Sequence, residues 1–182
     1  MVDALASLVN SFTVGDPLDT ATDIGPVVSA RQRDRVLGYI EDGKRSGARL
    51  IAGGGVPKDR PRGWFVDPTV FADVDNADRI AQEEIFGPVL AVIPYDSDRQ
   101  AIELANDSEF GLAGTVWSTD TDRATEVARE MRTGTVGVND YQLDVNAPFG
   151  GVKASGIGRE LGPEGLEEFF SLKSIYRVGD PS

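Results

Sequence analysis

Two short stretches of the sequence place carboxylates beside glycine or proline, a combination that can present a charged side chain to a bound ligand. The first is Gln82-Glu-Glu-Ile-Phe-Gly-Pro-Val89, and the second is the glycine-rich segment from Ala147 to Gly165, which contains Glu160. A carboxylate has two acceptor oxygens, so it can accept hydrogen bonds from two adjacent hydroxyls. A carboxylate in a partly desolvated pocket can also serve in proton transfer. These stretches are therefore the candidate sites of chemistry.

Other kinds of chemistry are limited by two missing residue types, because the sequence contains neither cysteine nor histidine. A thiolate nucleophile and a disulfide are impossible, and a zinc site is nearly excluded. Ser155 lacks the neighbouring base that activates a serine. The acidic run from Asp73 to Asp78 is not a calcium loop, because Asp78 stands where that loop needs glycine. We therefore expect no metal.

The charge balance is strongly acidic, with 18 basic and 30 acidic side chains and a net charge of −12. Such a surface repels phosphate backbones, so we expect no nucleic-acid partner. Solubility is the main role of this charge, and steering of a cationic substrate is a weaker alternative. No apolar run approaches the roughly 20 residues that span a bilayer. The first ten residues lack the features of a secretory signal, so we expect no membrane partner and a cytoplasmic location.

Hydrophobic periodicity and capping residues predict alternating helices and strands. The predicted helices cover 2–12, 30–46 (begun by Ser29 and ended by Gly47), 98–106, 121–132 (ended by Gly134) and 162–169. The predicted strands cover 49–52, 65–71, 89–94, 114–117, 135–138 and 172–178. Alternation between 89 and 138 favours right-handed crossovers and a mainly parallel sheet. The long loop over 139–165 is typical of a functional segment.

Both carboxylate-bearing stretches resemble signatures of the aldehyde dehydrogenase superfamily, and the resemblance runs from Gly15 to Lys173. It implies an α/β fold, namely the three-layer, mainly parallel sheet of the catalytic domain, incomplete, with a C-terminal oligomerisation strand. Residues 1–170 would form the C-terminal portion of that domain, and residues 171–182 the oligomerisation strand and tail. The cofactor domain and the catalytic cysteine would then lie upstream.

The resemblance also implies an activity, the oxidation of an aldehyde to a carboxylic acid with NAD or NADP. A thiolate would attack the aldehyde, a hydride would pass to the nicotinamide, and water would release the acid. Glu84 would accept hydrogen bonds from both hydroxyls of the nicotinamide ribose, and Phe86 would pack near the nicotinamide. Glu160 would serve as a catalytic relay for a proton or water, with a structural ion pair as the alternative.

Four further residues are implied to contact the substrate. Asn139 and Phe149 resemble positions at the active-site entrance, with Phe149 in the wall of the aldehyde tunnel. Tyr141 and Leu143 lie in the segment 140–146, where family members differ most, and are the candidates for substrate preference. The two aspartates of that segment are compatible with a polar or cationic substrate. Gln32 and Arg35 loosely resemble positions that approach the ribose or phosphate side of the cofactor.

Three interpretations of the chain follow from the missing nucleophile. It is part of an aldehyde dehydrogenase that works with a complementing N-terminal half, a non-catalytic module that joins intact relatives through its last strand, or a truncated product without function alone. Removal of a cofactor domain would expose apolar surface. We therefore expect the isolated chain to form homo-oligomers or aggregates.

Overall fold

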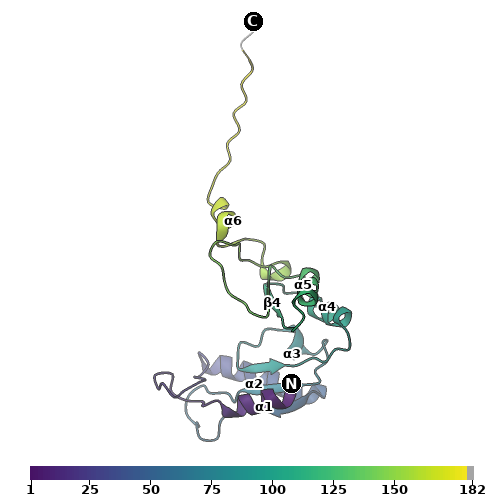
Figure 1. Ribbon diagram of the computed structural model, residues 1–182. Coiled ribbons are helices and arrows are strands. Elements are labelled where there is room, and N and C mark those ends of the chain that lie inside the picture. Colours follow the sequence, from purple (N-terminus) through teal and green to yellow (C-terminus); the bar gives the residue numbers. More distant parts are fainter. Residues whose placement is uncertain (180–182) are drawn as a thin grey trace. The chain divides into compact units, whose positions relative to one another are not determined.

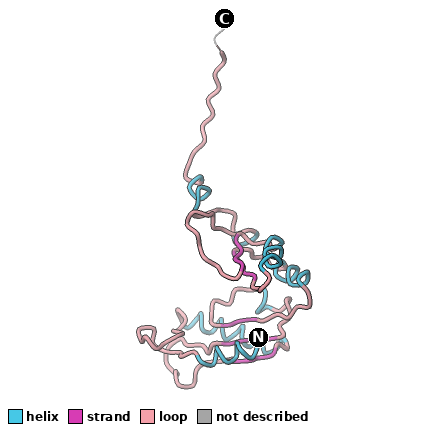
Figure 2. Tube along the Cα trace, in the orientation of Figure 1, coloured by secondary structure: helices cyan, strands magenta, loops and turns pink. Residues whose placement is uncertain are grey.

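The computed structural model describes residues 1–179 and divides the chain into two compact units, residues 1–97 and 98–182. Figure 1 shows the elements of each unit, and Figure 2 shows how much of the chain is loop. The first unit contains α1 (Val2–Ser11), α2 (Ala30–Ser46), β1 (Arg49–Ala52), β2 (Thr69–Ala72), α3 (Arg79–Gln82) and β3 (Val89–Ala91). The second contains α4 (Asp98–Asn106), β4 (Ala113–Val116), α5 (Thr121–Glu130), β5 (Thr135–Val138), a 3-10 turn η1 (Lys153–Ser155) and α6 (Gly162–Glu167). Residues 180–182, the end of the predicted tail, lie outside the described part.

The core of the first unit forms where α2 packs on a small mixed sheet. β2 is the central strand, antiparallel to β1 and parallel to β3. All four residues of β2 are buried, as expected for a strand covered on both faces. The core cluster contains Val36, Tyr39, Ile40, Val66, Phe71, Val74, Ile80 and Ile85. Its α2 members recur at i, i+3 and i+4, which places them on one face of the helix.

Both predicted ends of α2 are confirmed. The Ser29 side chain accepts a hydrogen bond from the Gln32 amide at 3.2 Å, which satisfies one of the free N–H groups at the helix start. Gly47 ends the helix with φ +96°, in the left-handed region that glycine adopts without a Cβ penalty. The cap fixes the residue at which α2 begins, and therefore also which side chains of its first two turns lie on the same face of the helix.

The second unit is built around a parallel pair of strands. β4 pairs with β5 in parallel, and α5 makes the connection between them, as the alternation in the sequence predicted. The predicted helix cap at Gly134 is wrong, because α5 ends at Met131 with extended backbone. Gly134 serves a packing role instead. A Cβ there would lie 1.5 Å from the carbonyl oxygen of Gly150, so only glycine lets the glycine-rich loop approach β5.

The α/β class is confirmed, but two parts of the predicted fold differ. The described strands form two separate sheets, of three and two strands, instead of one mainly parallel sheet, and the β1–β2 ladder is antiparallel. The strand predicted over 172–178 is absent, since residues 171–179 contain no helix or strand (Figure 2). A strand needs a partner edge for its backbone groups, and the described residues offer this segment none.

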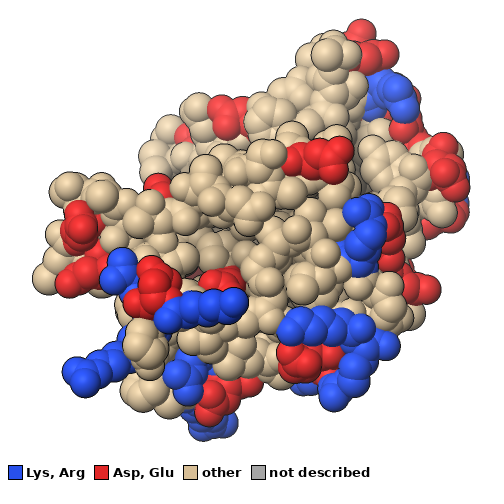
Figure 3. All heavy atoms as spheres, turned by 90° about the horizontal axis from the view of Figure 1, so that it is seen from below, with Lys and Arg blue, Asp and Glu red and all other residues tan. Residues whose placement is uncertain are grey.

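The surface mixes charges of both signs despite the acidic excess. Figure 3 shows Lys and Arg side chains beside Asp and Glu side chains on one face of the molecule. Several of these neighbours are ion pairs, among them Arg49 with Asp73 and Lys44 with Glu41. Over residues 1–179, no helix has the length and apolar character needed to cross a membrane.

The close approach at Gly134 gives a test with a matched control. Gly134→Ala should destabilise the chain by about 1–3 kcal/mol, because a methyl group cannot displace a backbone carbonyl without shifting the loop. Gly38 lies inside α2, where an added methyl group would meet nothing within 4 Å, so Gly38→Ala should stabilise by about 0.5–1 kcal/mol. Urea unfolding followed by circular dichroism measures both, and equal effects would contradict the packing role of Gly134.

Candidate functional site

The loop that carries Glu84 and Phe86 is held by side chains of α2. Gln32 Nε2 donates hydrogen bonds to the carbonyl oxygens of Ile85 at 3.1 Å and Phe86 at 2.9 Å. One turn further on, Arg35 donates to the carbonyl oxygen of Glu84 at 2.8 Å. Gln32 and Arg35 therefore bind the loop backbone in this structure, where the sequence predicted an approach to the cofactor.

The same loop contains a residue in a strained conformation. Phe86 has φ +54°, in the left-handed region that costs a non-glycine residue about 1–3 kcal/mol. The next residue is Gly87, where a Cβ would lie 2.5 Å from the Val36 side chain. The two bonds from Gln32 and the contact with the buried Val36 hold the chain in this turn. Such strain is a common property of ligand-binding loops.

Glu83 anchors the start of the loop to α2 and α3. Its carboxylate accepts hydrogen bonds from the Tyr39 hydroxyl at 2.6 Å and from Arg79 at 3.0 Å. Arg79 also bonds to Asp42 at 2.8 Å. The hydrogen bond from Arg79, followed by that from Tyr39, lowers the pKa of Glu83 below its ordinary value. Bonds from Arg79 and then Arg45 lower the pKa of Asp42 in the same way. Both acids are therefore structural.

Glu84 and Phe86, which follow Glu83 in the loop, face solvent, whereas Ile85 between them is buried. The Glu84 side chain is exposed, and 70% of the Phe86 surface is accessible. An exposed carboxylate beside an exposed aromatic ring, both on a rigid loop, can bind a ligand that has adjacent hydroxyls and a flat face. The predicted cofactor contacts are thus presented together, while the functional assignment stays a prediction.

Three of the four predicted substrate residues meet in one pocket of the second unit. Tyr141, Leu143 and Phe149 line a hollow of about 230 Å³ beside β5. The Tyr141 hydroxyl lies 2.7 Å from Thr135 Oγ1, which fixes the ring against the start of β5. Sequence reasoning missed Thr135, whose role depends on this contact between residues six positions apart.

Asn139 uses its side chain to hold the backbone of Ser118, and its place at the active-site entrance stays a prediction. Its side-chain amide donates to the Ser118 carbonyl and accepts from the Ser118 amide, each at 2.7 Å. It has φ +57°, and its own amide bonds to the Val116 carbonyl. Asn139 thus joins the ends of β4 and β5, and it is not among the residues that line the hollow.

Glu160 is joined to the tunnel-wall candidate Phe149 through the backbone. The amide of each residue bonds to the carbonyl of the other, at 2.7 Å in both directions. The Glu160 side chain is exposed in this chain, without the desolvation that we expected of a relay carboxylate. Arg159 donates to the carbonyls of Gly151 and Gly158 at 2.8 Å, so its guanidinium supports the glycine-rich loop.

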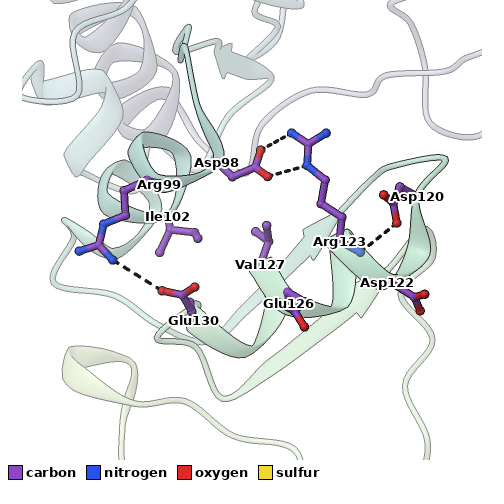
Figure 4. Close-up of a pocket in the computed structure, with 9 residues that line it drawn as sticks. All are labelled: Asp98, Arg99, Ile102, Asp120, Asp122, Arg123, Glu126, Val127 and Glu130. Carbon is purple, nitrogen blue, oxygen red and sulfur yellow. Dashed lines mark hydrogen bonds and ion pairs between the residues drawn. The ribbon is translucent and has the colours of Figure 1, made fainter.

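A second hollow lies between α4 and α5, and Figure 4 shows the charged residues around it. Asp98 pairs with Arg123, whose hydrogen bond lowers the pKa of Asp98 below its ordinary value. Arg99 pairs with Glu130 and Glu103. The pairs of Asp98 with Arg123 and of Arg99 with Glu130 join α4 to α5, whereas the pair of Arg99 with Glu103 lies within α4. Within residues 1–179, no group of three or more acidic side chains could hold a metal ion.

The chain is also similar to known proteins along nearly its whole length. The aldehyde dehydrogenase family matches residues 1–175, so the chain belongs to that family. Geranial dehydrogenase of Castellaniella defragrans is 59% identical over 179 residues, which are 98% of this chain and 37% of that protein. Betaine aldehyde dehydrogenase of Brucella melitensis is 47% identical over 96% of this chain and 37% of its own length.

Solved structures of aldehyde dehydrogenases are also similar to this chain. A Mycobacterium tuberculosis aldehyde dehydrogenase in complex with NAD+ is 53% identical, with a TM-score of 0.90 over 97% of this chain and 38% of that chain. A betaine aldehyde dehydrogenase point mutant of Staphylococcus aureus, also bound to NAD+, is 43% identical, with a TM-score of 0.93 over 99% and 37%. The chain therefore spans less than two fifths of the length of these relatives.

The ion pairs around Glu83 predict how stability depends on pH. Glu83 and Asp42 have folded pKa values below the unfolded ones. Their contribution to stability is complete above the unfolded pKa of about 4 and is lost progressively as the pH falls below it, through the lower folded pKa values. The melting temperature of the first unit should fall in that window. Arg79→Gln should flatten the fall, whereas Arg31→Gln, at an exposed position of α2, should leave it unchanged. An identical pH profile for Arg79→Gln would contradict the assignment.

Proposed function

We propose that this chain forms the C-terminal portion of the catalytic domain of an NAD(P)-dependent aldehyde dehydrogenase, which oxidises an aldehyde to a carboxylic acid. The family match over residues 1–175 is the observation that carries this proposal. The rigid loop that presents Glu84 and Phe86 supports it, because the NAD+-bound relatives have the same fold over this region. In that domain the two described sheets would belong to a three-layer, mainly parallel arrangement.

Glu84 and Phe86 would hold the nicotinamide end of the cofactor. The two oxygens of the exposed Glu84 carboxylate suit the two adjacent hydroxyls of a ribose. The Phe86 ring offers a flat apolar face to the nicotinamide. When bound, the cofactor accepts the hydride that leaves the substrate carbon. Gln32 and Arg35 contribute indirectly, since they fix the loop from which both side chains project.

The second unit would form one wall of the aldehyde tunnel. Phe149, Tyr141 and Leu143 surround a hollow that suits the body of a substrate, with Asn139 at its entrance through the backbone turn after β5. Glu160 would relay a proton or water, once the rest of the enzyme covers its exposed side chain. Its backbone bonds to Phe149 fix its distance from the tunnel wall.

The nucleophile must come from outside this sequence, which has no cysteine. The chain alone would therefore be inactive and would need a complementing N-terminal half. The aldehyde would be of the kind that the similar enzymes are named for, geranial or betaine aldehyde. The location would be cytoplasmic, and the enzyme a homo-oligomer without nucleic-acid or membrane partners.

A second candidate function is a non-catalytic module that joins complete relatives. Residues 171–179 favour it, because they form no helix or strand while exposing Leu172, Ile175, Tyr176 and Val178 almost completely. An extended segment with apolar side chains can add to the sheet edge of another chain. The same segment would serve as the oligomerisation arm of a working enzyme.

A chimera separates the two functions. In geranial dehydrogenase of Castellaniella defragrans, the part that matches this chain is replaced by residues 1–182, and NADH formation is measured. Turnover by the chimera supports the enzymatic role. A folded, cofactor-binding chimera without turnover contradicts it, and stimulation or binding of the intact enzyme by the free chain would then favour the module.

The role of Glu84 is tested in the same chimera. Glu84→Gln should lower kcat/KM for NAD by about 10- to 100-fold, since a hydrogen bond to a charged group contributes about 1.5–3 kcal/mol. Glu41→Gln is the matched control, because this exposed carboxylate pairs with Lys44 on α2, so its loss should leave cofactor use unchanged. Equal kinetic effects of the two variants would contradict the assignment of Glu84 as the ribose ligand.

The exposed tail gives a prediction for the chain by itself. Because Leu172, Ile175 and Val178 expose apolar surface, the chain should elute in gel filtration as an oligomer. Replacement of these three residues by serine should shift the elution towards the monomer without changing the circular dichroism of the folded units. A monomeric parent chain that binds no hydrophobic dye would refute this expectation.

A further inference from the structure

A loop of the second unit, residues 149–160, carries both Phe149 and Glu160. The reciprocal backbone bonds between these two residues close the loop at its base, and η1 lies at its turn. A loop that is held only at its base can pivot, and both residues would then move with it. The contacts that η1 makes with the rest of the unit therefore bear on where Phe149 and Glu160 lie.

Lys153, the first residue of η1, makes a charged contact with the end of α4. Its Nζ donates hydrogen bonds to the carbonyl oxygens of Asn106 at 2.8 Å and of Ser108 at 3.0 Å. Asn106 is the last residue of α4, and carbonyl groups at the end of a helix lack partners within it and carry the negative end of its dipole. The half-buried lysine supplies the donors and the charge that this helix end lacks.

The backbone of Lys153 has a conformation that is unfavourable for lysine. Its φ is +57°, in the left-handed region, which glycine adopts without a steric penalty and other residues adopt at a cost. Glycine occupies positions 150, 151, 156 and 158 of the same loop. Backbone shape alone would favour glycine at position 153 as well, so the lysine side chain contributes something that glycine cannot.

The turn that follows α4 is itself bonded to η1 and to the chain before β5. The amide of the buried Gly111 donates to Ser155 Oγ at 3.0 Å. The carbonyl of Gly111 accepts hydrogen bonds from the amides of Val152 and Gly134, each at 3.0 Å. A Cβ on Gly111 would lie 2.5 Å from the carbonyl oxygen of Arg132, so this turn packs closely against the chain that follows α5.

Asn106 connects the same end of α4 to the end of α5. Its side-chain amide donates to the carbonyl of Glu130 at 2.9 Å and accepts from the amide of Arg132 at 2.6 Å. The main-chain carbonyl of Asn106 is one of the two that Lys153 binds. The ammonium group therefore joins the 149–160 loop to the point where two helices end.

We propose that Lys153 is a positioning residue of the second unit, because its ammonium group holds the 149–160 loop on the end of α4 and so determines where Phe149 and Glu160 lie. Lys153 would touch neither the substrate nor the cofactor. The part of this inference that concerns turnover rests on the proposed function, in which Phe149 lines the tunnel and Glu160 is the relay. The part that concerns the loop does not depend on that function.

The first experiment measures the loop in the 182-residue chain without any reaction. Hydrogen exchange is followed by mass spectrometry in peptides that contain Phe149 or Glu160, whose amides bond to each other's carbonyls. Lys153→Met keeps the length of the side chain and removes its charge. It should lower the protection of both amides by about tenfold or more, as expected for the loss of hydrogen bonds from a charged group.

Three further variants make this result specific. Lys153→Arg keeps the charge and the donors, so protection of the loop should stay within about threefold of the parent chain. Lys44→Met removes a lysine of α2 that also donates to a carbonyl, that of Gly54, and it should leave the loop unchanged. Lys153→Gln, with the same expected loss of protection, replaces Lys153→Met if that variant does not fold.

Two outcomes of the exchange experiment would overturn the proposal. Unchanged protection of Phe149 and Glu160 in Lys153→Met would show that the loop does not depend on the ammonium group. An equal loss of protection in β4 and β5 would show that the substitution destabilises the whole unit instead of releasing the loop.

The second experiment measures turnover in the chimera with geranial dehydrogenase of Castellaniella defragrans. Lys153→Met should lower kcat by about tenfold and leave KM for NAD within about twofold, because the loop carries the relay while Glu84 and Phe86 lie in the first unit. Lys153→Arg should restore kcat. An unchanged kcat, or a rise in KM for NAD as large as the fall in kcat, would overturn the role in turnover. A parent chimera without turnover contradicts the proposed function, and the exchange result then decides the role of Lys153 alone.

Discussion

The face that α2 turns towards the sheet determines both the core of the first unit and the conformation of its candidate binding loop. Val36, Tyr39 and Ile40 are almost completely buried in the core. Val36 also blocks the space beside Gly87, and the Tyr39 hydroxyl holds Glu83. One helix face thus combines hydrophobic burial with hydrogen bonds to a strained loop. Loss of its register would release the core and the loop together.

Backbone strain is distributed along both candidate regions and is offset in each case by specific hydrogen bonds. Phe86, Asn139 and Leu161 all have positive φ, which side chains other than glycine adopt at a cost. Gln32 holds the carbonyl of Phe86, and Ser118 holds the Asn139 amide at both ends. Leu161 follows directly after the backbone bridge between Glu160 and Phe149. These contacts make the loops rigid without placing them in regular secondary structure.

The sequence predicted the helices of this chain well because their signals are local. Ser29 and Gly47 mark the two ends of α2, and the apolar spacing within α5 places Ala124 in the interior. The strand over 172–178 was predicted from a local alternation, yet a strand also requires a partner, which the sequence does not show. Glycine is the residue type that most often ends a helix, so Gly134 was predicted to be a cap. Its role depends instead on its contact with Gly150, sixteen residues away.

The residues of the candidate site that lie within the recognisable motifs were predicted from the sequence, whereas the contacts that support them were not. Glu84 and Phe86 were found from one stretch, and the structure presents them on one rigid loop. The role of Gln32 and Arg35 was missed because their partners are carbonyl oxygens about fifty residues away, which any residue type provides. The resemblance implies a place for Asn139 at the entrance, which stays a prediction, whereas the bond from its side-chain amide to Ser118 could not be read from the sequence.

The reciprocal bridge between Phe149 and Glu160 also has a mechanical consequence. Two 2.7 Å hydrogen bonds make the backbone of these residues move as one body, so a displacement of the aromatic wall displaces the carboxylate as well. In the proposed enzyme, the width of the tunnel and the position of the relay would therefore not be independent variables. If the proposed roles of the two residues hold, a lineage that widened this wall for bulkier substrates would have to readjust its proton path at the same time.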